Sequence, residues 1–491
     1  MTNATAPIPE TKSSENSTNA TSSQGRILSS GVQFKVDAQG IRQVLSEPAP
    51  TIQEFEAILH RARELKGLDR ADVAALLKVS DPNRIQQIQE VAKEAKEIIY
   101  GRRLVLFAPL YTGNKCSNSC TYCGFRQENK ALKRTVLSQN QIEAEVKELL
   151  KEGHKRVLML CGESEENPLE YFLEAIRVTY RARVGKAAIR RVNVEIAPLD
   201  VEGFRQLSQE KIGTYACFQE TYEPKAYGRY HPKGPKSDYE YRLDVMDRAM
   251  EGGISDVGVG ILFGLADYRF EVLALMEHAH HLESKYGCGP HTVSVPRIEP
   301  AEGAPFTQRV PHPVSDADFK KLIAIIRIAL PYTGIILSTR EKESLRNELF
   351  QYGISQISAG SRTNPGAYAD EGESAAGAQF SLGDHRSLEE VISGLIDAQY
   401  IPSFCTGCYR KGRVGADFMD LAKPGLIKEF CMPNGLFTFK EYLLDFASPE
   451  VKARGLALID KLTAEVEKKK LQTKMLDRLE QIEKGERDVY F

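Results

Sequence analysis

The hydrophobic pattern of the chain changes its period once, about a fifth of the way along. Over residues 51–103 apolar side chains recur at helical spacing, as Phe55 and Leu59 do. This spacing predicts amphipathic helices. The run Ser80-Asp81-Pro82 has the residues of a helix start and predicts a further helix after it.

Beyond that point short β-rich runs alternate with amphipathic helices. The eight runs are Val105–Tyr111, Arg156–Cys161, Arg191–Ala197, Thr214–Glu220, Asp256–Leu262, Thr292–Ile298, Gly334–Thr339 and Gly353–Ala359. Some of the helices between them have recognisable starts, such as the capping box expected of Ser138 with Gln141. Regular alternation is typical of a parallel sheet, and eight units can close into a barrel. The sequence therefore predicts an α/β fold built on a (β/α)8 TIM barrel.

Segments of different composition flank the predicted barrel. We expect a disordered tail over residues 1–34, because the first 25 residues hold thirteen Ser, Thr or Asn and too few apolar side chains to offset the entropy of ordering. An N-terminal helical extension follows over residues 35–100, and the barrel over 101–400. Residues 401–491 predict a mainly helical C-terminal domain, with three helical stretches and with turns at its Pro-Gly and Pro-Asn-Gly sequences.

Composition and charge exclude several classes of protein. The 491-residue chain has 65 Lys and Arg against 67 Asp and Glu, so it lacks the basic excess that nucleic-acid binding favours. No apolar run approaches the ~20 residues of a membrane span. The N-terminal segment lacks the apolar core of a secretory signal. Nine cysteines are too sparse and too odd in number for a disulfide framework. We therefore expect a cytoplasmic protein that binds metal through its cysteines and binds neither nucleic acid nor a membrane.

The first cysteine group, Cys116, Cys120 and Cys123, has the spacing CxxxCxxC just past the end of the first predicted strand. Barrel active sites lie at this end of the strands. Three thiolates can hold a [4Fe–4S] cluster and leave its fourth iron open, and S-adenosylmethionine (SAM) can fill that position with its amino and carboxylate groups. Tyr122 is a candidate to pack on the SAM adenine. A zinc site is the alternative, but it needs four ligands, and no fourth Cys or His is close in sequence.

This motif resembles that of the radical SAM superfamily, and other residues fit the resemblance. In radical SAM barrels a Gly-Glu at the end of the second strand contacts the SAM amino group, which implies that role for Glu163; a helix N-terminal glutamate is the alternative. For Glu195 and Glu220, on the third and fourth predicted strands, contact with cofactor or substrate competes with a structural ion pair. Gly260 would let adenine approach the backbone, although close strand packing explains a glycine about as well.

The second cysteine group, Cys405, Cys408 and Cys431, has the spacing CxxC-x22-C. Three thiolates again leave one iron of a cluster open. Zinc is a stronger competitor here, because CxxC is a common half-site for zinc. However, Cys431 supplies only a third ligand.

The barrel as a whole resembles the radical SAM tyrosine lyases. The matching stretches span most of residues 100–400 and are Cys116–Phe125, Thr292–Pro300, Leu337–Glu341 and Ser358–Tyr368. Within that family, chains that supply thiazole synthesis end near the end of the barrel, whereas the [FeFe]-hydrogenase maturases carry a C-terminal domain with CxxC-x22-C. The resemblance therefore implies a radical SAM barrel of the maturase type. It places the SAM cluster at the top and an auxiliary iron–sulfur cluster with a labile iron at the other end.

Arg340 ends the seventh predicted strand, where a guanidinium can clamp the carboxylate of an amino-acid substrate through two hydrogen bonds. An ion pair with Glu341 is the alternative. Ser358 and Ser361, near the end of the eighth strand, and Arg297, at the end of the sixth, are further candidates for the substrate pocket.

His291 starts the sixth predicted strand, at the end of the barrel where the resemblance places the auxiliary cluster. A neutral imidazole there can ligate a labile iron. The alternative is a polar residue at a strand end with no ligand role.

The resemblance also implies a reaction. The Cα–Cβ bond of L-tyrosine would be cleaved to give p-cresol and dehydroglycine, and dehydroglycine would yield carbon monoxide and cyanide on the auxiliary cluster for the hydrogenase active site. The implied partners are reduced ferredoxin or flavodoxin and other hydrogenase maturation proteins. Two alternatives stay open. One is a 2-iminoacetate synthase that supplies dehydroglycine for thiamine thiazole synthesis, and the other is a non-catalytic iron–sulfur scaffold or zinc-stabilised interaction protein.

Overall fold

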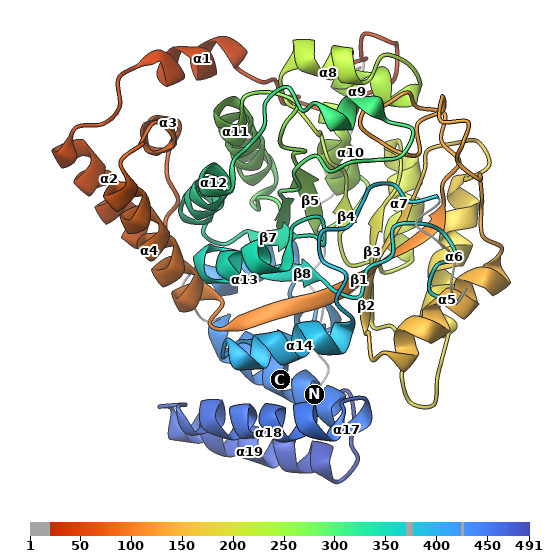
Figure 1. Cartoon of the computed structure of the whole chain (residues 1–491), viewed down its shortest axis with the longest axis vertical. Helices are drawn as coiled ribbons and strands as arrows, with labels where there is room; N and C mark the ends of the chain where they lie inside the picture. Colours follow the sequence, from red (N-terminus) through yellow and green to blue (C-terminus); the bar gives the residue numbers. More distant parts are fainter. Residues whose placement is uncertain (1–19, 370–376, 424–426) are drawn as a thin grey trace, which may run out of the picture.

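The strands form a closed parallel barrel. The computed structural model describes residues 20–369, 377–423 and 427–491. Its barrel strands are β1 (Arg103–Gly113), β2 (Arg156–Cys161), β3 (Arg191–Glu195), β4 (Tyr215–Ala216), β5 (Val257–Gly260), β6 (Thr292–Ser294), β7 (Gly334–Leu337) and β8 (Gln356–Ser358). Each strand from β2 to β8 pairs with the next, and β1 closes the ring by pairing with β8 and β2 (Figure 1). The predicted (β/α)8 barrel is thus confirmed, with all eight strands inside the predicted runs or overlapping them.

β1 is the longest described strand and has a third partner. Its residues 108–113 pair with β2, and residues 105–107 pair with β8. The first three residues, 103–105, pair in parallel with β9 (Ile401–Ser403). β9 was not predicted, because three residues carry too little pattern to be recognised as a strand. It ties the start of the C-terminal segment to the N-terminal end of the barrel.

Helices surround the barrel. They are α5 (Gln139–Lys151), α6 (Leu169–Arg181), α7 (Val201–Gln209), α8 (Pro224–Tyr230), α9 (Tyr239–Leu243), α10 (Val245–Glu251), α11 (Tyr268–Tyr286), α12 (Asp316–Ala329), α13 (Glu343–Tyr352) and α14 (Leu388–Asp397), with short 3-10 turns at Pro235–Ser237 and Pro305–Gln308. The capping box at the start of α5 is confirmed. The Ser138 N–H donates to Gln141 Oε1 at 2.9 Å, and Ser138 Oγ accepts from the Gln141 N–H at 3.4 Å.

Four helices precede the barrel: α1 (Ala38–Ser46), α2 (Ile52–Arg63), α3 (Arg70–Leu77) and α4 (Pro82–Ile99). α4 packs along α12 and α13, so this extension lies against the outer helical ring (Figure 1). The Asp81 carboxylate accepts a hydrogen bond from the Arg84 N–H at the start of α4, as the helix-start signal predicts.

The described part of the expected tail, residues 20–34, makes specific contacts with the barrel helices. Ser22 Oγ donates to Asp238 Oδ2 at 2.6 Å, and Ser29 Oγ donates to Asp244 Oδ1 at 2.6 Å. Residues 1–19 lie outside the described residues. This differs from the expectation of disorder up to residue 34, because composition alone does not show that buried carboxylates on other elements will bind these small hydroxyl groups.

The C-terminal segment is helical, with α15 (Gly407–Arg410), α16 (Gly415–Ala422), α17 (Lys428–Asp445), α18 (Pro449–Ala464) and α19 (Lys469–Glu483). The turn predicted at Pro433-Asn434-Gly435 is wrong, because α17 continues through it. Tertiary contacts outweigh the local preference there. The Asn434 side chain accepts a hydrogen bond from the Phe491 N–H at 2.7 Å, and α17 packs on β9. The predicted Pro-Gly turn falls outside the described residues.

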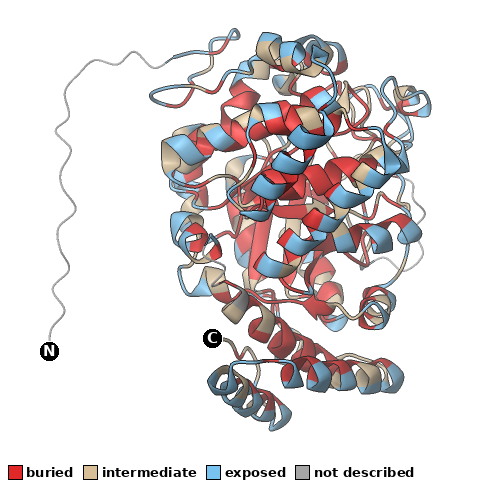
Figure 2. Cartoon of the chain, turned by 90° about the vertical axis from the view of Figure 1, so that its left-hand side faces the viewer, coloured by how far each residue is buried: buried red, intermediate tan, exposed pale blue. Residues whose placement is uncertain are grey.

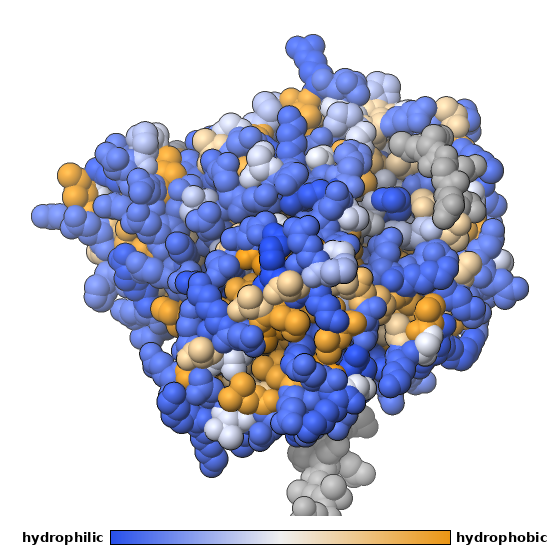
Figure 3. All heavy atoms as spheres, turned by 60° about the horizontal axis from the view of Figure 1, so that its bottom comes forward, coloured by the Kyte–Doolittle hydropathy of each residue, from blue (hydrophilic) through white to orange (hydrophobic). Residues whose placement is uncertain are grey.

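Buried residues are concentrated in the strands and in the parts of the helices that pack against them (Figure 2). The same core continues into the C-terminal helices through Leu436 and Phe439 of α17. From the end that carries these helices most of the surface is polar, with apolar side chains gathered near its middle (Figure 3). Among the described helices none combines the length and the apolar character that crossing a membrane requires.

Glu441 of α17 joins the C-terminal helices to the barrel. Its buried carboxylate forms an ion pair with Lys155, which directly precedes β2. The same carboxylate accepts hydrogen bonds from the N–H groups of Asp488 and Val489, at 2.6 and 3.1 Å. One side chain therefore holds the barrel, α17 and the last residues of the chain together.

We expect Glu441→Ala to lower the free energy of unfolding by about 3 kcal/mol, because it leaves the Lys155 ammonium, whose side chain is only 16% exposed, and two N–H groups without partners. Glu480→Ala is a matched control. Glu480 pairs with Lys484 on the surface, where the two side chains are 64% and 70% exposed, so its loss should cost much less. Urea unfolding of both variants measures the difference. Equal losses would show that Glu441 does not join the two parts.

Candidate functional site

The first cysteine group opens into a cavity at the C-terminal ends of the strands, which we call the upper cavity. It has a volume of about 630 Å³. Its lining includes Cys116, Cys120, Cys123, Asn118, Tyr122, Glu163, Glu195, Glu220, Lys236, Arg242 and Gln379. The structure thus brings the three thiols together with the three glutamates that the sequence predicted for SAM or substrate.

Hydrogen bonds within the cysteine loop hold its first thiol and Glu163 in place. The Asn118 side-chain amide donates to Glu163 Oε2 at 2.7 Å and to Cys116 Sγ at 3.7 Å. The Ser117 N–H donates to the Glu163 carbonyl at 2.7 Å. Glu163 therefore lies beside the cysteines, with its carboxylate already oriented by a neutral donor.

The thiols of the upper cavity are suited to a cationic cluster. Burial raises the pKa of Cys120 to about 12, and Lys236 only partly offsets it. Burial and the neighbouring Cys116 raise the pKa of Cys123 to about 11. Three closely spaced thiolates, one of them buried, are unfavourable without compensating positive charge, and iron in a [4Fe–4S] cluster provides it. The donor set therefore fits the cluster that the motif implies.

The two inner glutamates differ in their surroundings. Lys236 Nζ binds Glu220 Oε1 at 2.7 Å; burial alone would raise the pKa of Glu220, but Lys236 and Arg242 hold it below its usual range. Glu195 has no hydrogen bond or ion pair within the described residues, and burial together with Glu220 raises its pKa to about 7. Glu220 therefore forms the structural ion pair that was the alternative to a ligand contact. The carboxyl group of Glu195 remains available to a ligand.

Tyr122 and Gly260, both predicted to contact adenine, lie in different places. Tyr122 lines the upper cavity, and its hydroxyl is 2.8 Å from His231 Nε2. Gly260 is not among the described residues that line this cavity. A Cβ on Gly260 would lie 2.5 Å from the ring of Phe218, so the glycine allows that ring to pack against β5. Close packing of the Phe218 ring, which was the alternative to an adenine contact, therefore explains the glycine at position 260.

A second cavity, the central cavity, lies inside the barrel next to the upper one and has a volume of about 880 Å³. Arg340 lines it, and its guanidinium stacks on the ring of Phe380 at 3.3 Å from the ring centroid. Within the described residues no carboxylate forms a salt bridge with Arg340. Glu341, its predicted competitor, instead binds Arg297. Arg340 therefore has a partly buried guanidinium that can take a ligand carboxylate.

Arg297 does not reach the central cavity. Its guanidinium pairs with Glu341 and with Asp316, the latter at 2.8 Å, and donates to the Val314 carbonyl at 2.9 Å. These contacts engage it outside the barrel interior. The prediction of Arg297 as a substrate residue is not supported by its position, because sequence order along a strand does not show which side of its end the side chain takes.

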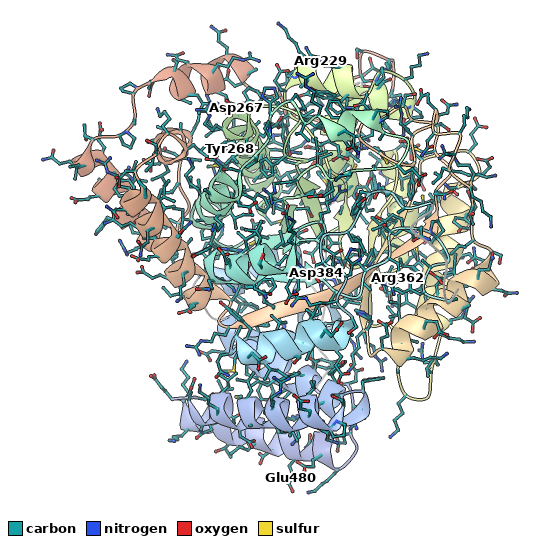
Figure 4. All side chains as sticks on the ribbon, in the orientation of Figure 1. Arg229, Asp267, Tyr268, Arg362, Asp384 and Glu480 are labelled. Carbon is teal, nitrogen blue, oxygen red and sulfur yellow. The ribbon has the colours of Figure 1, made fainter. Side chains whose placement is uncertain are left out.

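The two predicted serines do line the central cavity. The Ser358 backbone is fixed by Arg346, which donates to the Ser358 carbonyl at 2.6 Å. Arg346 also forms an ion pair with Asp384, which is labelled in Figure 4. Ser361 is buried, and its hydroxyl has no hydrogen-bond partner within the described residues. A buried hydroxyl on a cavity wall without a protein partner is available to a ligand.

The second cysteine group lines a third cavity, the lower cavity, at the N-terminal ends of the strands, with a volume of about 550 Å³. Cys405, Cys408, Cys431 and His291 all face it. A hydrogen bond from Cys408 holds the pKa of Cys431 below its usual range. His291 Nδ1 is buried without a hydrogen bond, 3.6 Å from Asp256. Burial lowers the pKa of His291 to about 4, so the imidazole is neutral. Thiols and a neutral imidazole with an unused nitrogen fit an iron site.

Three arginines that we did not single out from the sequence also line the lower cavity. Arg103, Arg156 and Arg191 are the first residues of β1, β2 and β3 and are all buried. Burial, with Arg191 nearby, lowers the pKa of Arg156 to about 9. Two of these arginines begin predicted strands, and Arg103 lies two residues before the first predicted strand, so the series could have been noticed in the sequence. It places positive charge beside the thiols of the lower cavity.

The central and lower cavities are consecutive layers of one barrel interior. Along β1, Arg103 and Val105 line the lower cavity, whereas Phe107, Pro109 and Tyr111 line the central one. Alternate residues of a strand point to the same side, so this series faces inward throughout. The two cysteine groups are therefore at opposite ends of one barrel, joined through its interior.

Comparisons with known proteins agree with this arrangement. A family model described as the radical SAM superfamily matches residues 110–279, and one described as the biotin and thiamin synthesis associated domain matches residues 294–401. The 2-iminoacetate synthase of Salmonella typhimurium is 32% identical over 344 residues, which cover 69% of this chain and 87% of that protein.

Two solved structures are similar over almost the whole chain. A crystal structure of HydG, a maturase of the [FeFe]-hydrogenase, is 45% identical with a TM-score of 0.90, and the match covers 93% of this chain and 99% of that one. HydG from Carboxydothermus hydrogenoformans is 40% identical with a TM-score of 0.79, covering 90% and 97%. Matches of this extent continue past the barrel into the C-terminal domain. The chain therefore belongs to the radical SAM superfamily and, within it, to the HydG family.

Proposed function

We propose that this radical SAM enzyme cleaves the Cα–Cβ bond of L-tyrosine to p-cresol and dehydroglycine, and converts dehydroglycine to carbon monoxide and cyanide at the lower cavity for assembly of an [FeFe]-hydrogenase active site. The observation that carries the proposal is the arrangement of two three-cysteine cavities at opposite ends of one barrel interior, with an unpaired arginine between them. Reduced ferredoxin or flavodoxin is the proposed electron donor, and other maturation proteins would receive the product.

The central cavity is suited to an aromatic amino acid. Arg340 can bind the α-carboxylate through its planar guanidinium, which Phe380 keeps in one orientation. Ser361 can donate its free hydroxyl to the same substrate. The remaining wall is largely apolar, with Phe107, Leu160 and Phe218 among its residues, and so accommodates a phenol ring.

The upper cavity would hold the reactive cofactors. Cys116, Cys120 and Cys123 would bind a [4Fe–4S] cluster that, with SAM on its open iron, supplies a 5′-deoxyadenosyl radical after one-electron reduction. Glu163 would accept a hydrogen bond from the SAM amino group. Glu195 lines both the upper and the central cavities, so its carboxyl group lies where cofactor and substrate would meet.

The lower cavity would act on the two-carbon fragment. Its three cysteines and His291 would hold an auxiliary iron–sulfur cluster with a labile iron, which supplies the site where carbon monoxide and cyanide form. Arg103, Arg156 and Arg191 place three buried positive charges there, and among the described residues Asp256 is the only carboxylate that pairs with them. This excess of positive charge favours an anionic fragment, such as the carboxylate of dehydroglycine.

A second candidate is a 2-iminoacetate synthase, favoured by the 32% identity with that enzyme of Salmonella typhimurium. That match covers 69% of this chain, so it accounts for the barrel and leaves the second cysteine group without a role. If the second cysteine group held a structural zinc ion, the barrel would likewise be the only catalytic part, and the C-terminal domain would have no role in the reaction. Counting iron and zinc in anaerobically prepared protein separates these cases, because about eight irons correspond to two clusters.

The direct test is an anaerobic reaction with SAM, tyrosine and dithionite. The proposal expects p-cresol, cyanide and carbon monoxide together. Formation of p-cresol with glyoxylate in place of carbon monoxide and cyanide would support the 2-iminoacetate synthase instead.

Arg340→Lys should weaken tyrosine binding about 10-fold or more and uncouple SAM cleavage from p-cresol formation. Lysine keeps the charge but loses the planar pair of donors that fixes the carboxylate. The ratio of 5′-deoxyadenosine to p-cresol measures the coupling. Arg309→Lys, an exposed site away from the cavities, is the control. Unchanged affinity and coupling in Arg340→Lys would remove Arg340 from the substrate site.

The double variant Cys405→Ser, Cys408→Ser should continue to make p-cresol while carbon monoxide falls at least 10-fold. The upper and central cavities are untouched, but a lone Cys431 cannot hold a cluster. Cys288→Ser is the control, because Cys288 packs in the same hydrophobic cluster as Cys431 without lining the lower cavity. Normal carbon monoxide from the double variant would refute the role of the lower cavity. Loss of soluble protein would favour a structural zinc site.

A further inference from the structure

Gln379 lies on the wall between the upper and central cavities and lines both. Its side-chain nitrogen Nε2 donates to Cys123 Sγ at 3.7 Å. Its side-chain oxygen accepts a hydrogen bond from the Tyr111 hydroxyl at 2.8 Å. Tyr111 lines the central cavity but not the upper one. One amide group therefore connects a thiol of the first cysteine group with a wall of the substrate cavity.

The chemistry of its two neighbours fixes the orientation of this amide. A thiolate only accepts hydrogen bonds, so the NH2 group must face Cys123. The opposite orientation would place the amide oxygen against a thiolate and lose the bond. With the NH2 group on sulfur, the amide oxygen is left to accept the Tyr111 proton. The hydrogen bond from the Tyr111 hydroxyl to the amide oxygen thus keeps the NH2 group of Gln379 directed at the Cys123 sulfur.

The backbone around Gln379 is fixed on both sides. Its carbonyl accepts a hydrogen bond from the Gly124 N–H at 3.0 Å, and its N–H donates to the Thr363 carbonyl at 3.0 Å. Gly124 directly follows Cys123, and a Cβ there would lie 2.6 Å from the Ala378 carbonyl oxygen. The absence of a side chain at position 124 therefore lets this segment approach the cysteine loop closely enough for the amide to reach the sulfur.

Asn118 and Gln379 both donate to a thiol of the first cysteine group, but their other contacts differ. Asn118 donates to the thiol of Cys116, and its other contacts are with Glu163 and the Lys236 N–H, around the upper cavity. Gln379 comes from the segment after β8, far from the cysteines in sequence, and contacts a residue of the central cavity. Only a donor placed in this way can respond to what occupies the substrate site.

We propose that Gln379 is a positioning residue that couples the substrate cavity to the electron affinity of the first cluster through its hydrogen bond to Cys123. The inference rests on the proposed function, because it requires a cluster on the first cysteine group. A hydrogen bond to a ligating sulfur withdraws electron density and raises the reduction potential of the cluster. A substrate that binds the Tyr111 hydroxyl removes the anchor of the amide, weakens the bond to sulfur and lowers the potential.

The test is a redox titration of the anaerobically reconstituted enzyme, followed by electron paramagnetic resonance. The signal that SAM perturbs identifies the first cluster. We expect a lower midpoint potential in Gln379→Leu, which lacks both contacts. Tyr111→Phe should show a smaller shift in the same direction, and adding tyrosine should shift the wild-type potential but not that of Gln379→Leu. Gln127→Leu, an exposed glutamine four residues after Cys123, is the control and should match the wild type.

Gln379→Glu adds a readout that a purely structural role would not produce. Its carboxyl group has nearly the size of the amide, but donates to sulfur only when protonated. The potential of this variant should therefore fall as the pH rises through the titration of that carboxyl group, by more than the wild-type potential changes. If Gln379→Leu fails to retain a cluster, the pH dependence of Gln379→Glu alone shows whether residue 379 affects the potential of the first cluster.

Wild-type potential in Gln379→Leu with an intact cluster, or no additional pH dependence in Gln379→Glu, would overturn the inference. These results are distinct from failure of the proposed function. If the first cysteine group held no cluster, the wild-type enzyme itself would show no signal that responds to SAM. If tyrosine were not the substrate, the wild-type enzyme would show that signal but would form no p-cresol.

Discussion

The hydrogen bonds along β1 are the constraint on which the rest of the structure depends. This strand closes the barrel by pairing with β8 and β2, and its first residues also pair with β9. Its inward-facing residues run from the lower cavity to the central one, and the chain enters the first cysteine loop three residues after β1 ends. Both cysteine groups are thus placed by one continuous strand, whose length sets how far apart they lie.

The charges inside the barrel follow from this placement. Buried thiols and buried arginines are each unfavourable alone, because burial disfavours their ionised forms. The lower cavity places three arginines beside three cysteines, and the upper cavity places Lys236 and Arg242 beside another three. Arg297 and Glu341 neutralise each other outside the central cavity, which leaves Arg340 as the charged group for a substrate. The distribution of ion pairs is what distinguishes a ligand-binding arginine from a structural one.

Local sequence signals predicted much of this arrangement. The eight strands, the capping box at Ser138 and the helix start at Asp81 depend on neighbouring residues, and the structure confirms them. Cysteine spacing singled out both three-cysteine groups, each of which lines a cavity, and strand order placed His291 at the same cavity as the second group. The differences arise where distant segments meet. Gly260 serves the packing of Phe218, Pro433 lies within a helix that packs on β9, and Gln379 reaches Cys123 from the other end of the barrel sequence. No periodicity or spacing records such contacts.

The pairing of β9 with β1 also has a consequence for biosynthesis. These strands are separated by about three hundred residues, and β9 leads directly into the second cysteine group. During translation the first cysteine loop leaves the ribosome long before residue 401, whereas the second group cannot take its place until the ring has closed and β1 offers its free edge. The two cysteine groups of the nascent chain therefore take their places one after the other. A chain cut short near residue 400 would contain the eight barrel strands and the first cysteine group, and would lack the second group together with the strand that anchors it.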